Sequence, residues 1–138
     1  MPWIAPAGVD GAVLARAARV KLAVFDVDGV LTDGSLLYGP AGEEIKSFNT
    51  LDGHGLKMLK DSGVELAIIS GRSSAALKAR ARDLGIDQLF MGVADKRQVF
   101  TQLLESLSLE GAAVAGIGDD VVDLPYLTRC GFSACVPA

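Results

Sequence analysis

The chain of 138 residues has little of what several large protein classes require. No apolar run approaches the ~20 residues that a membrane-spanning helix needs, so we expect no such helix. Acidic residues outnumber basic ones and the net charge is −4, which argues against a nucleic-acid-binding surface. One histidine and two cysteines provide no cluster of the nitrogen and sulfur ligands that are typical of zinc sites.

The two cysteines, Cys130 and Cys135, are expected to be reduced and buried rather than joined in a disulfide. Residues 1–11 lack the basic start and apolar core of a secretory signal, and cytoplasmic proteins keep their thiols reduced. We therefore expect a cytoplasmic protein. Residues 1–11 are rich in Pro and Gly and are expected to be a loose extension, followed by a short helix over residues 12–19.

Half of the residues are apolar and 22% are charged, a composition typical of a globular domain. The apolar residues form short runs, each as long as a buried strand, at residues 20–25, 65–69, 88–91, 112–117 and 132–136. Between these runs apolar side chains recur at helical spacing, as at Leu77, Ala81 and Leu84. Strands that alternate with helices predict an α/β domain with a doubly wound (Rossmann-like) parallel sheet and helices on both faces.

One segment interrupts this alternation directly after the first predicted strand. Residues 35–38 and 44–48 are strand-like and flank a turn-forming Gly-Pro-Ala-Gly sequence, which predicts a β-hairpin inserted at this point. A two-stranded ribbon is only marginally stable alone. Apolar side chains such as Leu37 and Ile45 are therefore expected to pair hairpins between subunits, in a closed homotetramer.

Polar side chains gather where the predicted strands end. They are Asp26 and Asp28, then Ser70 and Arg72, then Asp95 and Lys96, and finally Asp119, Asp120 and Asp123. Ligands of open α/β sheets bind beyond the carboxyl ends of the strands, so we expect these groups to surround one crevice. Singly each has an ordinary alternative, such as a helix start at Ser70 or a surface lysine at Lys96, and the prediction rests on their joint occurrence.

The chemistry of this set is that of a metal and a phosphate. Carboxylates packed together repel one another unless a cation neutralises them, and an all-oxygen ligand set suits Mg²⁺. A lysine and a serine hydroxyl can hold phosphate oxygens and offset charge in the transition state. A carboxylate aimed at phosphorus can act as a nucleophile and form an acyl-phosphate.

The same motifs resemble those of the haloacid dehalogenase superfamily. Residues 26–33, Asp-Val-Asp-Gly-Val-Leu-Thr-Asp, resemble its first signature, residues 70–72 its second, Lys96 its third, and residues 118–120 with Asp123 its fourth. The resemblance covers the chain from Lys21 to its last residue. It implies a magnesium-dependent phosphatase, a phosphoric monoester hydrolase that works through an aspartyl-phosphate.

Three further features resemble the cap-less 3-deoxy-D-manno-octulosonate 8-phosphate phosphatases: the hairpin, residues 48–55 and residues 118–125. This resemblance implies hydrolysis of that phosphorylated sugar acid to the free sugar acid and phosphate, by a homotetramer that serves lipopolysaccharide synthesis. The family continues beyond the fifth strand with a helix, a strand and a Gly-rich tail, so we expect the chain to be truncated at its C-terminal end. We expect residues 1–19 to be an extension with a short helix and residues 20–138 to be the phosphatase domain.

The resemblance also implies a role for each matching residue. Asp26 is expected as the nucleophile and Asp28 as the general acid and base, with Ser70 and Lys96 holding the phosphoryl oxygens. Magnesium is expected on Asp26, on the backbone carbonyl of Asp28 and on Asp119, while Asp120 and Asp123 orient Lys96 or metal-bound water. The residues implied to bind the substrate are Asp28, Asn49, Thr50, Leu51, Asp52, Gly53, Lys57, Arg72, Arg80 and Lys96.

Two of these neighbourhoods have a second interpretation. His54 is expected in a Gly-flanked loop, at the edge of the pocket or the start of a helix, without a catalytic role. Arg80 either meets the carboxylate of a sugar acid or lies on the solvated face of its helix.

Alternative functions stay open. One is a phosphatase for another sugar-acid phosphate, such as a nonulosonate 9-phosphate. A receiver domain that keeps its phosphate has no need for Asp28, two residues after the phosphoacceptor. A non-catalytic assembly module has no need for both Asp26 and Asp28. The exact sugar acid is not determined by the sequence.

Overall fold

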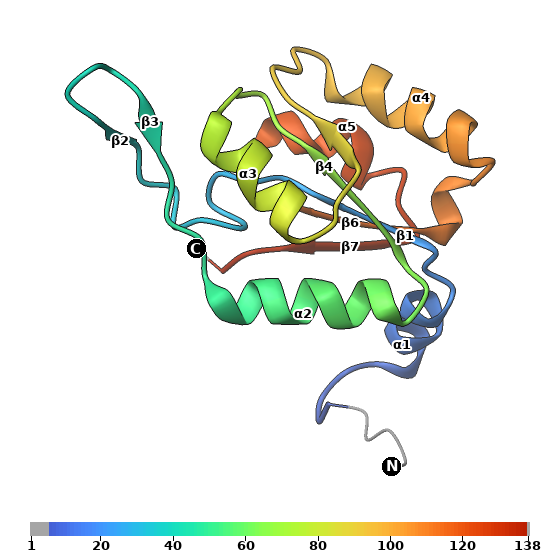
Figure 1. Ribbon diagram of the computed structural model, residues 1–138. Coiled ribbons are helices and arrows are strands. Elements are labelled where there is room, and N and C mark those ends of the chain that lie inside the picture. The colour runs from blue at the N-terminus through green and yellow to red at the C-terminus, as the bar shows by residue number, and fades with distance from the viewer. Residues whose placement is uncertain (1–5, 138) are drawn as a thin grey trace.

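A computed structural model describes residues 6–137, so residues 1–5 of the predicted loose extension, and Ala138, lie outside the described part. A parallel five-stranded sheet in the order β5-β4-β1-β6-β7 forms the centre of the molecule (Figure 1). Its strands in chain order are β1 (Leu22–Phe25), β4 (Glu65–Ile69), β5 (Gln88–Phe90), β6 (Val114–Gly118) and β7 (Phe132–Cys135). The predicted doubly wound α/β sheet is confirmed.

Helices cover both faces of this sheet. They are α1 (Gly11–Ala18), α2 (Thr50–Asp61), α3 (Ala75–Asp83), α4 (Lys96–Leu107) and α5 (Leu124–Leu127), with short 3₁₀ turns η1 (Gly111–Ala113) and η2 (Val121–Asp123). Successive side chains of β1 point to opposite faces. Ala23 packs with the buried residues of α2 and α3, whereas Leu22 and Val24 pack with those of α4 and α5.

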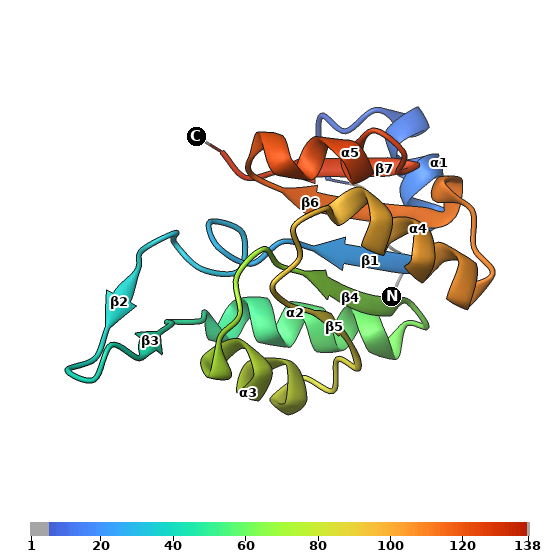
Figure 2. The same cartoon turned by 90° about the horizontal axis from the view of Figure 1, so that it is seen from above.

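The predicted hairpin is present as β2 (Leu37–Tyr38) paired antiparallel with β3 (Glu44–Ile45). Its regular strands are shorter than the sequence pattern indicated. Figure 2 shows the hairpin projecting beyond the carboxyl ends of β1 and β4, away from the body of the sheet. Leu37 and Ile45 are about half exposed, so the hairpin leaves apolar surface uncovered within this chain.

Two expectations from the sequence are corrected. The segment around His54 is not a loop, because His54 lies in the second turn of α2, where its side chain is exposed. Helix α2 begins at Thr50 because the side chain of Asn49 accepts a hydrogen bond from the backbone N–H of Leu51 at 2.8 Å. The cysteines are unpaired as predicted, but only Cys130 is partly buried; Cys135 is exposed at the end of the edge strand β7.

Among residues 6–137, none of the helices combines the length and apolar character that crossing a membrane requires.

Candidate active site

The catalytic candidates converge because their strands are neighbours. β1 lies between β4 and β6, so Asp26 after β1, residues 70–72 after β4 and Asp119 after β6 reach the same edge of the sheet. They surround a hollow of ≈ 420 Å³. Its lining residues are Asp26, Asp28, Gly34, Gly71, Arg72, Val93, Ala94, Lys96, Asp119, Asp120 and Val122. The predicted crevice beyond the strand ends is therefore present.

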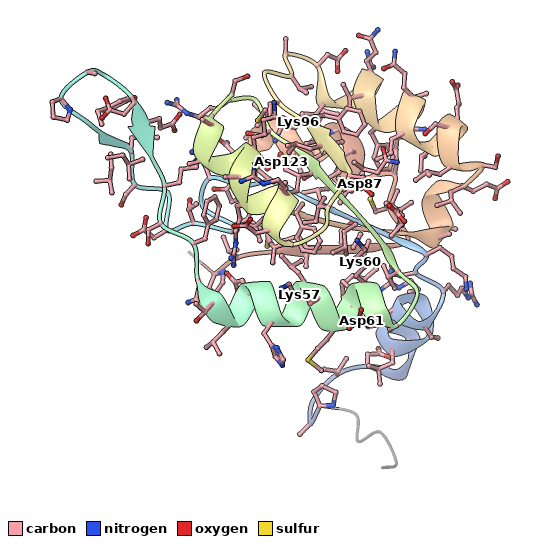
Figure 3. All side chains as sticks on the ribbon, in the orientation of Figure 1. Lys57, Lys60, Asp61, Asp87, Lys96 and Asp123 are labelled. Carbon is pink, nitrogen blue, oxygen red and sulfur yellow. The ribbon has the colours of Figure 1, made fainter. Side chains whose placement is uncertain are left out.

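A buried ion cluster lies at the bottom of this hollow. The Lys96 ammonium donates to Asp26 Oδ1 at 2.9 Å and to Asp123 Oδ1 at 2.6 Å. Figure 3 shows Lys96 and Asp123 close together. Lys96 is the first residue of α4, and Asp95 fixes that helix start by accepting the N–H groups of Arg97 and Gln98. The Lys96 side chain is only 5% exposed and that of Asp123 is fully buried.

Burial and charge work against each other in this cluster. Burial raises the pKa of Asp26 to about 6, although the hydrogen bond and the charge of Lys96 act to lower it. Burial alone lowers the pKa of Lys96, but its hydrogen bonds to Asp123 and Asp26 outweigh burial and raise the pKa overall. Lys96 is therefore a permanent cation that holds the Asp26 carboxylate in place.

The loop after β6 places the remaining carboxylates. Asp123 Oδ2 accepts the backbone N–H groups of Asp119 and Asp120 at 3.1 and 3.3 Å, so both oxygens of Asp123 are occupied by donors from the protein. The Asp119 carboxylate is exposed and lies against Gly29. A Cβ at position 29 would lie 2.0 Å from Asp119 Oδ2, and the φ of +84° at Gly29 also favours glycine. Glycine at position 29 thus leaves the room that Asp119 needs.

The donor set of this site fits a divalent cation. Oxygens of Asp26, Asp119 and Asp123 all lie within 4.8 Å of one another. Within residues 6–137, Lys96 is the one ammonium in a salt bridge with any of these carboxylates, and it pairs with Asp26 and Asp123, so the cluster keeps an excess of negative charge. Since Asp123 already accepts from Lys96 and the backbone, Asp26 and Asp119 are the carboxylates with oxygens available to a metal. Asp123 is placed to orient Lys96, whereas Asp120 caps η2 by accepting the N–H of Val121.

A second charged network connects the hollow with the hairpin. Lys46, just after β3, donates to Asp28 Oδ1 at 2.6 Å and to Glu44 Oε1 at 2.8 Å. Arg72 donates to the same Glu44 oxygen at 3.3 Å and to the Tyr38 hydroxyl at 3.3 Å. Sequence reasoning missed Lys46 and Glu44. Their spacing of two places them on one face of the strand predicted over residues 44–48, but the sequence does not reveal that this face meets Asp28.

The predicted substrate-binding residues are spread over more than one place. Arg72 lines the catalytic hollow, whereas Asn49 and Asp52 line a neighbouring hollow of ≈ 420 Å³ together with Leu31, Thr32, Asp33, Ser47 and Phe48. Ser70 is 1% exposed, and its hydroxyl accepts the backbone N–H of Arg72 at 3.2 Å.

The other predicted contacts lie on or against α2. Arg80 donates to the Asn49 carbonyl oxygen at 3.1 Å, and its guanidinium lies 5.5 Å from the centre of the Phe48 ring. Arg80 also covers Gly53, which is buried. Thr50, Leu51 and Lys57 are exposed, and Figure 3 shows Lys57 on α2, apart from Lys96 and Asp123.

Comparisons with known proteins agree with this geometry. The model of the haloacid dehalogenase-like hydrolase family matches residues 40–131. The chain is 43% identical over 124 residues to 3-deoxy-D-manno-octulosonate 8-phosphate phosphatase of Yersinia pestis; the match covers 90% of this chain and 66% of the Yersinia protein, so the chain spans about two thirds of that relative.

Two solved structures are similar over most of the chain. A probable YrbI-family phosphatase of Pseudomonas syringae shares 52% identity at a TM-score of 0.89, covering 91% of this chain and 72% of that one. The 3-deoxy-D-manno-octulosonate 8-phosphate phosphatase of Moraxella catarrhalis, solved with magnesium, phosphate and the sugar acid, shares 43% identity at a TM-score of 0.88 with the same coverage. The chain belongs to the family of haloacid dehalogenase-like hydrolases.

Proposed function

We propose that this chain is a magnesium-dependent phosphatase that hydrolyses 3-deoxy-D-manno-octulosonate 8-phosphate to the free sugar acid and phosphate. The observation that carries the proposal is the buried Asp26 carboxylate, held by Lys96 at 2.9 Å at the bottom of a hollow that Asp28 and Asp119 also line. The relatives from Yersinia pestis and Moraxella catarrhalis carry the name of this activity, which supports the choice of substrate. A role in lipopolysaccharide synthesis is part of the same proposal.

The reaction has two steps, both centred on Asp26. A carboxylate oxygen of Asp26 attacks phosphorus, and the bond from phosphorus to the sugar oxygen breaks as the aspartyl-phosphate forms. Asp28 gives its proton to the leaving sugar oxygen. Asp28 then takes a proton from water, whose oxygen attacks phosphorus and releases phosphate from Asp26.

The surrounding residues supply charge and position. Lys96 holds Asp26 and offsets the charge of the transferred group, and Ser70 is the candidate hydroxyl for a phosphoryl oxygen. Asp26, Asp119 and the backbone carbonyl of Asp28 are the proposed magnesium ligands. When bound, magnesium supplies Lewis-acid stabilisation of the phosphoryl oxygens and neutralises the acidic cluster.

The substrate's sugar-acid part is proposed to lie towards Arg72 and the second hollow. Arg72 lines the catalytic hollow, and a guanidinium can grip a carboxylate with two parallel hydrogen bonds. Asn49 and Asp52 line the adjoining hollow and can bind sugar hydroxyls. The remaining substrate candidates, Thr50, Leu51, Gly53, Lys57 and Arg80, are proposed to act across a subunit contact.

A homotetramer and a cytoplasmic location complete the proposal. The half-exposed Leu37 and Ile45 of the hairpin provide an apolar surface that a second subunit can bury. The two thiols are unpaired, which is typical of a reducing compartment.

The test is phosphate release from a panel of substrates. The panel contains 3-deoxy-D-manno-octulosonate 8-phosphate, a nonulosonate 9-phosphate, a hexose 6-phosphate and p-nitrophenyl phosphate, each with magnesium and with EDTA. We expect the highest kcat/KM on the first, and no turnover in EDTA. A higher kcat/KM on the nonulosonate would overturn the substrate, and full activity in EDTA would overturn the metal.

A further inference from the structure

Lys46 is a buried cation that the reaction described above does not use. Its side chain is 2% exposed, and it comes from the hairpin, 18 residues along the chain from Asp28. Burying an ammonium is costly unless it is paired, and Lys46 is paired with Asp28 and Glu44. Burial lowers its pKa, but the hydrogen bonds to Asp28 and Glu44 outweigh burial and raise the pKa. Lys46 therefore stays charged.

The contact is made with one oxygen of the general acid and base. Lys46 donates to Asp28 Oδ1 at 2.6 Å, and no other side-chain hydrogen bond to Asp28 is found within residues 6–137. Asp28 Oδ2 is thus left without a protein donor in that part of the chain. A carboxyl group that must deliver a proton along one line needs one oxygen fixed and the other available.

Glu44 fixes Lys46 in turn. It shares one oxygen between Lys46 and Arg72, and its side chain is 13% exposed. Because Arg72 follows β4 and Glu44 belongs to β3, this oxygen joins the hairpin to the end of the sheet. The Lys46 ammonium is therefore held from the hairpin side while it holds Asp28.

We propose that Lys46 is a positioning residue for Asp28, which fixes Oδ1 so that Oδ2 carries the proton to the leaving oxygen and takes one from water. This inference rests on the proposed function only in needing phosphoryl transfer through Asp26 and Asp28. It does not depend on which sugar acid is the substrate. It also gives the hairpin a catalytic task within its own chain.

The experiment compares Lys46→Met and Lys46→Arg with a matched control, Lys78→Met, an exposed lysine on α3. Each is measured with the sugar-acid phosphate and with p-nitrophenyl phosphate, whose leaving group needs little proton donation. We expect Lys46→Met to lower kcat/KM on the sugar-acid phosphate by ~10–100-fold, as for impaired acid catalysis, and on the aryl phosphate by less than ~3-fold. Lys46→Arg should recover much of the loss, and Lys78→Met should match the wild type.

A rapid-mixing measurement adds a signature that a purely structural role does not produce. In Lys46→Met, hydrolysis of the aspartyl-phosphate also needs Asp28, so p-nitrophenol should appear in a burst equal to the enzyme concentration. The double variant Asp28→Asn with Lys46→Met should be no slower than Asp28→Asn alone, because Lys46 acts through Asp28. Thermal melts of all variants check that each is folded, and Lys46→Gln replaces Lys46→Met if the latter is not.

Other outcomes overturn the inference. Multiplicative losses in the double variant mean that Lys46 acts independently of Asp28. A raised KM for the sugar-acid phosphate with unchanged kcat means that Lys46 binds substrate instead. The proposed function is judged separately, on the wild type alone, by release of phosphate from the sugar-acid phosphate.

Discussion

The carboxylate of Asp26 is buried beside the ammonium of Lys96, and the balance between burial and pairing determines its protonation. A carboxyl group whose pKa is higher in the folded state than in the unfolded state stabilises the fold at low pH. That stability is lost as the pH rises through the folded pKa. At neutral pH the metal-free protein therefore keeps a charge at Asp26 that its surroundings disfavour, which is the condition under which a cation binds well.

Replacing Asp26 tests both its proposed role as the nucleophile and the effect of its charge on stability. Asp26→Asn should abolish turnover, because an amide does not attack phosphorus at a useful rate. In EDTA at pH 7.5 it should raise the free energy of unfolding by ~1–3 kcal/mol, since a pKa unit corresponds to ~1.4 kcal/mol. The control Asp61→Asn removes the same charge at an exposed position on α2. It should change neither the turnover nor the free energy of unfolding. Wild-type turnover in Asp26→Asn is incompatible with an aspartyl-phosphate at this position.

The pH dependence of stability follows from the same group. With the pKa of Asp26 raised to about 6, its contribution is complete below pH ~4 and is lost progressively up to pH ~6. Denaturant unfolding of wild type and Asp26→Asn in EDTA between pH 4 and 8 measures the difference. Between pH ~4 and ~6, the free energy of unfolding of the variant should rise relative to that of the wild type by up to ~3 kcal/mol. Above pH ~6 the difference should stay constant. A difference independent of pH contradicts the raised pKa.

Magnesium should stabilise the wild type at neutral pH. A ligand at 100 times its dissociation constant adds ~2.7 kcal/mol, so the melting temperature should rise by several degrees on adding magnesium. Asp119→Asn removes an exposed carboxylate of the cluster and should abolish this rise, while Asp61→Asn retains it. An equal rise in Asp119→Asn excludes Asp119 as a ligand.

At the scale of elements, the sequence was most informative where one physical effect dominated. The strand at residues 65–69 was predicted with its observed bounds. A strand buried on both faces is a continuous apolar run, and its ends are marked where the apolar residues stop. His54 was expected in a loop at the pocket edge or at the start of a helix, since the flanking Gly53 and Gly55 are weak helix formers; instead it lies within α2. Tertiary contacts override that preference at Gly53, which is buried beneath Arg80.

The two glycines of α2 should respond differently to alanine. No atom lies within 4 Å of the position that a Cβ at Gly55 takes, so Gly55→Ala should raise the free energy of unfolding by ~0.5–1 kcal/mol. A Cβ at Gly53 meets the Arg80 guanidinium, so Gly53→Ala should raise the free energy of unfolding by less, or lower it. Urea unfolding of both variants measures the two changes. An equal gain at both positions means that Arg80 does not constrain α2.

At the scale of the whole molecule, the order of the strands makes the site. The sequence placed Asp26 and Asp119 at strand ends, but it did not fix that β1 and β6 are neighbours, which is what joins them. Charged contacts between the hairpin and the sheet, such as Lys46 with Asp28, could not be predicted either. They depend on how two separate elements are oriented, and no local pattern encodes that orientation.

Assembly is the expected state of the whole molecule. Leu37→Glu with Ile45→Lys should dissociate the proposed tetramer, because charges replace the apolar surface that subunits bury. Met58→Lys, at an exposed apolar position on α2, is the control and should leave the assembly intact. Light scattering after size exclusion gives the mass. A wild-type chain that is monomeric at micromolar concentration contradicts the proposal.

The central position of β1 also has a consequence for the order in which the protein is built. A ribosome synthesises this strand early, yet its neighbour β6 begins only at Val114 and the last carboxylate of the cluster at Asp123. A nascent chain therefore carries Asp26 long before it carries Lys96 and Asp123, and pairing across a separation of 70 residues, as between Asp26 and Lys96, is slow. The cluster is thus complete only after Asp123 has been made, so that a chain interrupted before it carries Asp26 without the carboxylate that orients Lys96.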